Sequence, residues 1–162
     1  SRRLNLVLVP ATLQAELDEG RFQSAWSSWS SQGFITSTGR AGPRAEDWVK
    51  GGFVLARLDR PPGAATYGNR VGGFHVDCPI CGEAVARAWG TAVQALKGGS
   101  QWALCCPHCG QELGPNQVHT RPPAALARFA IELRDVGSST LRDRKVFEDV
   151  LGPDFRLLGV RG

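Results

Sequence analysis

The 162-residue chain lacks any apolar run that approaches the roughly 18 residues needed to cross a bilayer as a helix. Its first stretch, RRLNLVLVP, places two basic residues before a short apolar segment. That segment is too short for a signal peptide, and a polar helical pattern follows it instead of a small-residue cleavage site. The sequence therefore predicts a cytoplasmic protein with no membrane partner.

The signatures of several enzyme classes are also missing. The chain contains no G-x-x-x-x-G-K-[ST], G-x-S-x-G or H-E-x-x-H string, which removes the phosphate-loop, hydrolase and metalloprotease motifs. The three histidines, His75, His108 and His119, have no visible catalytic partner, and we interpret them as surface or loop residues. An enzyme stays open as an alternative if its pocket assembles from scattered residues.

A large excess of charge of one sign is missing too. The chain has 19 Lys and Arg against 15 Asp and Glu, a formal net charge of +4, which by itself does not imply a nucleic-acid partner. Apolar residues make up 42% of the chain and charged residues 21%, which indicates a folded core and not a disordered chain. The length suits one domain, or one domain with a small inserted module.

What the chain does have is two matched cysteine strings, or knuckles, CPICG at 78–82 and CPHCG at 106–110. Their four thiols form the tetrahedral set that a structural zinc ion requires, so zinc is the predicted cofactor. The predicted ligands are Cys78, Cys81, Cys106 and Cys109. With zinc bound, the four thiolates and the ion lower the net charge of the chain to about +2.

The fifth cysteine, Cys105, is predicted not to be a ligand. Ligation by Cys105 with Cys109 would place three residues between the two thiols and lose the match with CPICG. Neighbouring strand residues face opposite sides, so Cys105 should point away from Cys106. An odd cysteine count also argues against a secreted disulfide framework.

Two other interpretations of CPHC are weaker. The string resembles the active site of thioredoxin-like oxidants, but Gly110 and the Gly114-Pro115 pair leave no room for the long helix that such a site needs. A zinc-deaminase pattern also fails, because it would need Glu where Asp77 stands.

Hydrophobic periodicity predicts the elements on either side of the knuckles. Thr12 should cap a helix beginning near Leu13, and residues 32–52 should form a long loop. Outside the knuckle region, strands are predicted at 4–9, 53–58, 127–134 and 154–160, and helices at 13–31 and 146–151. Within it, short strands before and after each knuckle (74–76, 83–85, 102–104 and 111–113) and a short helix at 91–97 are predicted. We predict an α+β fold, in which the four strands outside the knuckle region form one antiparallel sheet covered by two helices, as in ferredoxin-like folds.

The region 72–115 resembles the zinc-ribbon family, on the strength of its four cysteines alone. The resemblance implies a structural metal site in a module that binds nucleic acid or protein. Residues 1–71 and 116–162 are predicted to form a single discontinuous α+β domain, with 72–115 inserted as the zinc ribbon.

A candidate partner-binding surface lies in the glycine-rich stretch 63–73, where Tyr67, Asn69 and Arg70 combine stacking with positive charge. The alternative is a flexible connector into the ribbon. Phe22, Trp26 and Trp29 repeat at helical spacing, which favours a core face over an interface stripe.

These features predict a non-enzymatic binding or adaptor protein with a structural zinc site made of four cysteines. A protein partner is favoured over nucleic acid, because a charge of about +2 supplies little affinity for phosphate. A nucleic-acid-binding zinc-ribbon protein is the alternative, and an enzyme with an unread active site is the second. The sequence predicts no oligomeric state.

Overall fold

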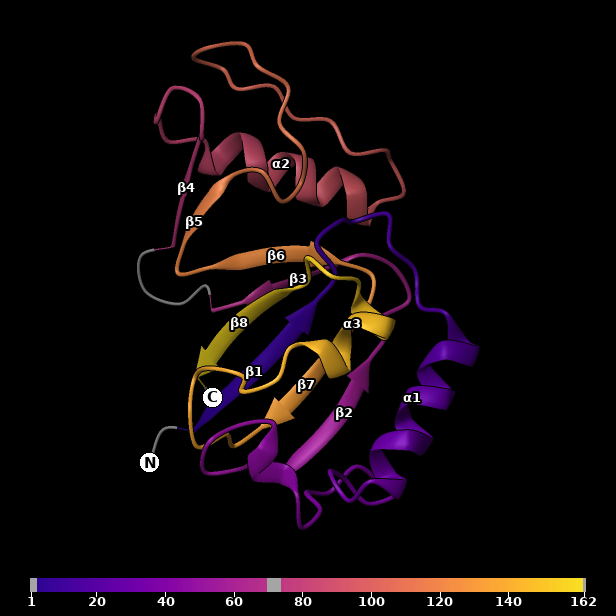
Figure 1. Cartoon of the computed structure of the whole chain (residues 1–162). Coiled ribbons are helices and arrows are strands. Elements are labelled where there is room, and N and C mark those ends of the chain that lie inside the picture. The colour runs from indigo at the N-terminus through magenta and orange to yellow at the C-terminus, as the bar shows by residue number, and fades with distance from the viewer. Residues whose placement is uncertain (1–2, 70–73, 162) are drawn as a thin grey trace.

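The computed structural model describes residues 3–69 and 74–161, which form an α+β fold (Figure 1). Its helices are α1 (Glu19–Ser31), α2 (Ala86–Lys97) and α3 (Lys145–Leu151), with a 3-10 turn at Ala45–Asp47. Its strands are β1 (Leu4–Val9), β2 (Leu55–Asp59), β3 (Ala65–Gly68), β4 (His75–Asp77), β5 (His119–Arg121), β6 (Ala124–Ala127), β7 (Ala130–Arg134) and β8 (Arg156–Arg161). None of the helices in these ranges combines the length and the apolar composition that crossing a membrane requires.

The predicted strands meet in one sheet. Its order is β2-β7-β1-β8, and every neighbouring pair is antiparallel. The register places Leu6 of β1 opposite Leu133 of β7, so apolar residues of neighbouring strands share a face. The α+β class is confirmed, and the ferredoxin-like assignment stays a prediction.

Helices α1 and α3 contribute side chains to the core on one face of this sheet. Trp29 of α1 and Phe147 of α3 lie in the same buried cluster as Leu6 and Leu8 of β1. The centre of the cluster is Trp48, whose ring stacks on Phe34 with centroids 5.1 Å apart. Phe22 and Trp29 are buried and Trp26 is half-buried, as a core face requires.

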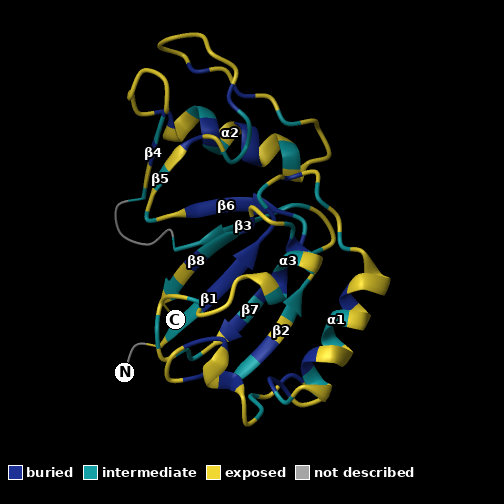
Figure 2. Ribbon diagram, in the orientation of Figure 1, coloured by how far each residue is buried: buried dark blue, intermediate teal, exposed yellow. Residues whose placement is uncertain are grey.

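Strands β3 and β6 cover part of the opposite face. They pair with each other in a separate two-stranded sheet, and Ala125 and Ala127 of β6 pack with Val7 and Val9 of β1. Strand β6 is buried along its whole length (Figure 2). Because β1 is covered on both faces, it needs apolar residues at successive positions, which explains the run LNLVLV.

The first helix begins later than predicted. The structure starts α1 at Glu19, where the side chain of Asp18, and not of Thr12, accepts a hydrogen bond from the Arg21 backbone N–H at 3.0 Å. Leu13 and Leu17 do not share a helical face. Leu17 packs against the cluster that contains Trp29 and Phe147, whereas Leu13 belongs to a second buried cluster, which includes Cys78 and Cys106. The predicted loop at 32–52 is confirmed, with its one short turn.

Three short strands, β3, β5 and β6, were not predicted from the sequence. Residues 65–68 lie in β3 and not in a loop, and they pair with β6. Strand β5 pairs with β4, which places residues 119–121 beside the strand that precedes the first knuckle. The short helix predicted at 91–97 is longer, because α2 begins at Ala86, directly after the first knuckle.

Asn116, which follows the second knuckle in the chain, forms side-chain hydrogen bonds to the backbone of β6. Its Nδ2 donates to the carbonyl oxygens of Leu126 at 2.9 Å and Ala11 at 3.2 Å, and its Oδ1 accepts from the Leu126 N–H at 2.7 Å. Leu126 is fully buried, so its backbone groups have no water to replace these bonds.

We expect Asn116→Ala to lower the free energy of unfolding by about 2–3 kcal/mol, because two buried backbone groups of Leu126 would lose their partner. Urea denaturation measures the change. The matched control is Gln117→Ala, which removes one hydrogen bond from an exposed part of the chain and should cost much less. Equal losses in the two variants would contradict the role given to Asn116.

Candidate metal centre

Four cysteine sulfurs converge at one point beside α2. The Sγ atoms of Cys78, Cys81, Cys106 and Cys109 all lie within 4.8 Å of one another. Two of the pairs that join the knuckles are Cys78 with Cys109 at 3.8 Å and Cys81 with Cys106 at 3.7 Å. A tetrahedral zinc ion with Zn–S bonds of about 2.3 Å requires S···S edges of about 3.8 Å. The donor set therefore fits a tetrahedrally bound metal ion.

The two knuckles are built alike. Residues 74–85 read FHVDCPICGEAV and residues 102–113 read WALCCPHCGQEL, at a constant offset of 28 positions. In each, the glycine N–H donates to the carbonyl of the first cysteine at 2.9 Å (Gly82 to Cys78, Gly110 to Cys106). A single antiparallel bridge closes each turn, Asp77 with Ala84 and Cys105 with Glu112. The two halves thus present their thiols in equivalent ways.

The glycine that ends each knuckle is required by its backbone conformation. Gly82 has φ of 78° and Gly110 has φ of 77°, in the left-handed region that residues with a Cβ rarely adopt. No neighbouring atom lies within 4 Å of a Cβ built at either position. The constraint is therefore conformational and not steric.

The metal centre rests on a second hydrophobic core. Cys78 and Cys106 are buried within it, whereas Cys81 and Cys109 are exposed. Trp89 and Val93 of α2 belong to this core, and Leu126 of β6 connects it to the rest of the fold. Strands β4 and β5, α2 and the knuckles lie together, and β6 separates them from the four-stranded sheet (Figure 1).

Backbone N–H groups prepare the site for negative charge. The pKa of Cys106 is lowered to about 6. The main cause is the N–H of Cys109, which donates to the Cys106 sulfur, and the N–H of His108 and the thiols of Cys109 and Cys81 add to the effect. The N–H of Ile80 donates to the Cys78 sulfur at 3.4 Å. One sulfur of the set therefore ionises readily without a metal.

The exposed pair behaves differently. The N–H of Glu83 favours the Cys81 thiolate, but desolvation and its own S–H bonds to Cys106 and neighbouring sulfurs raise the pKa of Cys81 to about 12. The pKa of Cys109 is also raised, since the N–H of Gln111 is outweighed by desolvation and the Cys106 sulfur. A metal ion must displace these protons, so binding depends on a divalent cation strong enough to do so.

Cys105 lies outside the four-sulfur group. It is exposed whereas Cys106 is buried, as strand alternation predicts. In the part of the chain that the structure describes, the four cysteines are the one group of three or more His, Cys, Asp or Glu side chains close enough to share a metal ion.

The predicted partner surface is only partly described. Tyr67 lies in β3, half-buried, and its hydroxyl donates to Asp59 Oδ2 at 2.7 Å. Burial raises the pKa of Tyr67, and the bond to Asp59 adds to the increase. Asn69 is half-buried, and Arg70 lies outside the described residues. The assignment of these three residues to a partner stays a prediction.

The three histidines do not meet. His75 of β4 is opposite Arg121, His119 of β5 is opposite Asp77, and His108 lies in the second knuckle. The sequence did not predict a structural role for Trp102. Its indole N–H donates to the Leu113 carbonyl at 2.9 Å, which joins the segments before and after the second knuckle. The offset of 28 residues from Phe74 was the available signal for it.

Comparisons of this chain with protein-family models, curated proteins and solved structures found no match. The assignment of the centre therefore depends on its own geometry.

Proposed function

We propose that this chain is a zinc-binding, non-enzymatic binding or adaptor protein built around a structural zinc ribbon. The observation that supports this function is the spacing of the four cysteine sulfurs, of which two pairs across the knuckles, at 3.7 and 3.8 Å, match the edges of a zinc tetrathiolate. Four protein ligands complete the tetrahedron, so no coordination position is left for a substrate. Zinc would supply a cross-link between the knuckles.

This role has consequences for how the chain is organised. Residues 1–71 and 116–162 would form one α+β domain and 72–115 the inserted ribbon, whose small core the metal stabilises. A cytoplasmic location is part of the proposal, because free thiols persist in reducing compartments.

A protein partner is favoured over nucleic acid. The metal-bound chain would have a net charge of about +2, and affinity for phosphate grows with the number of cations that neutralise it. The exposed sulfurs of Cys81 and Cys109 add negative charge on the surface of the metal centre, which would repel a phosphate backbone.

Elemental analysis and two binding assays test this function. We expect one zinc ion per chain, loss of ordered structure in the ribbon on chelation, and no tight binding of oligonucleotides. Micromolar, strongly salt-dependent binding of an oligonucleotide would replace the protein partner with nucleic acid. Turnover of any small substrate would contradict a non-enzymatic role, and a zinc-free, folded chain would contradict the metal site.

A further inference from the structure

The tip of the first knuckle has an apolar side chain that neither the fold nor the metal site uses. Ile80 is 66% exposed, and with Val54 at 50% it makes up the exposed large hydrophobic residues of the described chain. The turn itself needs only the backbone N–H of Ile80, which bonds to the Cys78 sulfur. At the equivalent position of the second knuckle stands His108, so the architecture does not require an apolar residue there.

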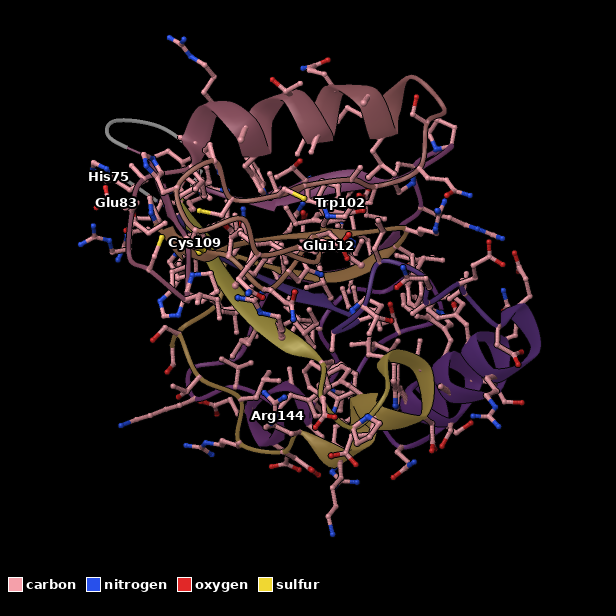
Figure 3. All side chains as sticks on the ribbon, turned by 90° about the horizontal axis from the view of Figure 1, so that it is seen from above. His75, Glu83, Trp102, Cys109, Glu112 and Arg144 are labelled. Atoms are coloured by element: carbon pink, nitrogen blue, oxygen red, sulfur yellow. The ribbon has the colours of Figure 1, made fainter. Side chains whose placement is uncertain are left out.

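The side chains around Ile80 are exposed, and the basic groups near them are His75, which lies beside Glu83 in Figure 3, and Arg121, which forms an ion pair with Asp77 at 3.5 Å. Pro79 and Pro107, one in each knuckle, are exposed, and so are Cys81 and Cys109. Glu83 and Glu112, on the segments leaving the knuckles, are exposed too, and Cys109 lies between them in the view from above (Figure 3). In the part of the chain described, neither glutamate forms an ion pair within 4.0 Å.

We propose that this surface, the knuckle face formed by Pro79, Ile80, Cys81, Glu83, Cys109 and Glu112, docks a basic segment of a partner protein. The segment presents one aliphatic side chain to Ile80 and places Lys or Arg side chains against the metal-bound sulfurs and the glutamates. This inference rests on the proposed function and adds to it the place and the chemistry of the partner.

Charge complementarity selects this occupant. A divalent ion held by four thiolates has a net charge of about −2, and the two glutamates add to it. Cations that approach an acidic face are drawn to it, whereas nucleic acid and acidic segments are repelled. An apolar anchor contributes most to binding when the contacts around it exclude water, which a partner segment lying across the knuckle face would do for Ile80.

A display library of short random peptides, selected on the zinc-loaded chain, tests the inference. We expect enrichment of sequences that combine several Lys or Arg with one Leu, Ile or Val. Ile80→Ser should weaken an enriched peptide about tenfold, as loss of an interface anchor does. Glu83→Gln should weaken it about threefold at low salt and not at high salt.

The matched control is Val54→Ser, which removes the other exposed hydrophobic side chain, far from the knuckles in sequence, and should leave the affinity unchanged. Enrichment of neutral or acidic peptides, no enrichment at all, or equal affinity in Ile80→Ser would each overturn the docking surface. Zinc content, measured on the same samples, separates this failure from failure of the proposed metal site, since Ile80 contributes no ligand to the metal.

Discussion

Replacing Cys106 with serine should abolish zinc binding and unfold the segment that contains the knuckles. The side chain is buried, and its sulfur lies 3.7 Å from that of Cys81, so serine would leave one corner of the tetrahedron empty. Structural zinc contributes about 10–16 kcal/mol of apparent binding free energy in zinc-finger peptides. A whole domain is stable by only about 5–15 kcal/mol, so the second core should not survive without the ion.

Cys105→Ser is the matched control, since it makes the same change one residue away at an exposed position. We expect full zinc content and an unchanged thermal midpoint in that variant. Hydrogen exchange should show loss of protection over β4, α2 and β5 in Cys106→Ser alone. Zinc loss in Cys105→Ser with retention in Cys106→Ser would reverse the ligand assignment.

The cluster of four cysteines could be predicted from the sequence because each pair is local and the pattern is repeated. Each knuckle sets the positions of two thiols through a turn of five residues, and the second copy supports the first. The burial of each cysteine could not be predicted from the local pattern. Cys78 and Cys81 differ only by their place in the turn, yet one is buried and the other exposed, because the core that contains α2 covers one side of the site.

The main sheet was predictable for a related reason. Alternation in β7 and the apolar run of β1 reflect which faces are covered. Strand β1 has the predicted bounds, whereas β7 begins at Ala130 instead of residue 127, because Ala127 ends β6. Strands β3 and β6 were not predictable, since ATYG and AALA are too short for a period to emerge. Their pairing is set by tertiary contacts with β1, and the side-chain bonds of Asn116 to Leu126 depend on the same long-range packing.

Trp48→Ala should have the largest effect on the other core. The indole is 1% exposed, stacks on Phe34 and Phe53, and meets Phe147 edge-on with centroids 4.8 Å apart. Truncation would leave a cavity that these aromatic side chains cannot close, at a cost of about 3–5 kcal/mol. The indole N–H has no hydrogen-bond partner in the described chain, so the loss would be apolar packing alone.

Two further variants and the zinc content make this prediction decisive. Trp48→Phe removes the unpaired N–H with a smaller cavity and should cost clearly less than Trp48→Ala, and so should Trp26→Ala, which changes a half-buried tryptophan. Urea denaturation measures all three.

Because the Trp48 cluster and the core beneath the knuckles have no buried residue in common, zinc should stay bound when Trp48→Ala loosens the α1–α3 core. Simultaneous loss of zinc would show one cooperative unit and contradict the inserted ribbon.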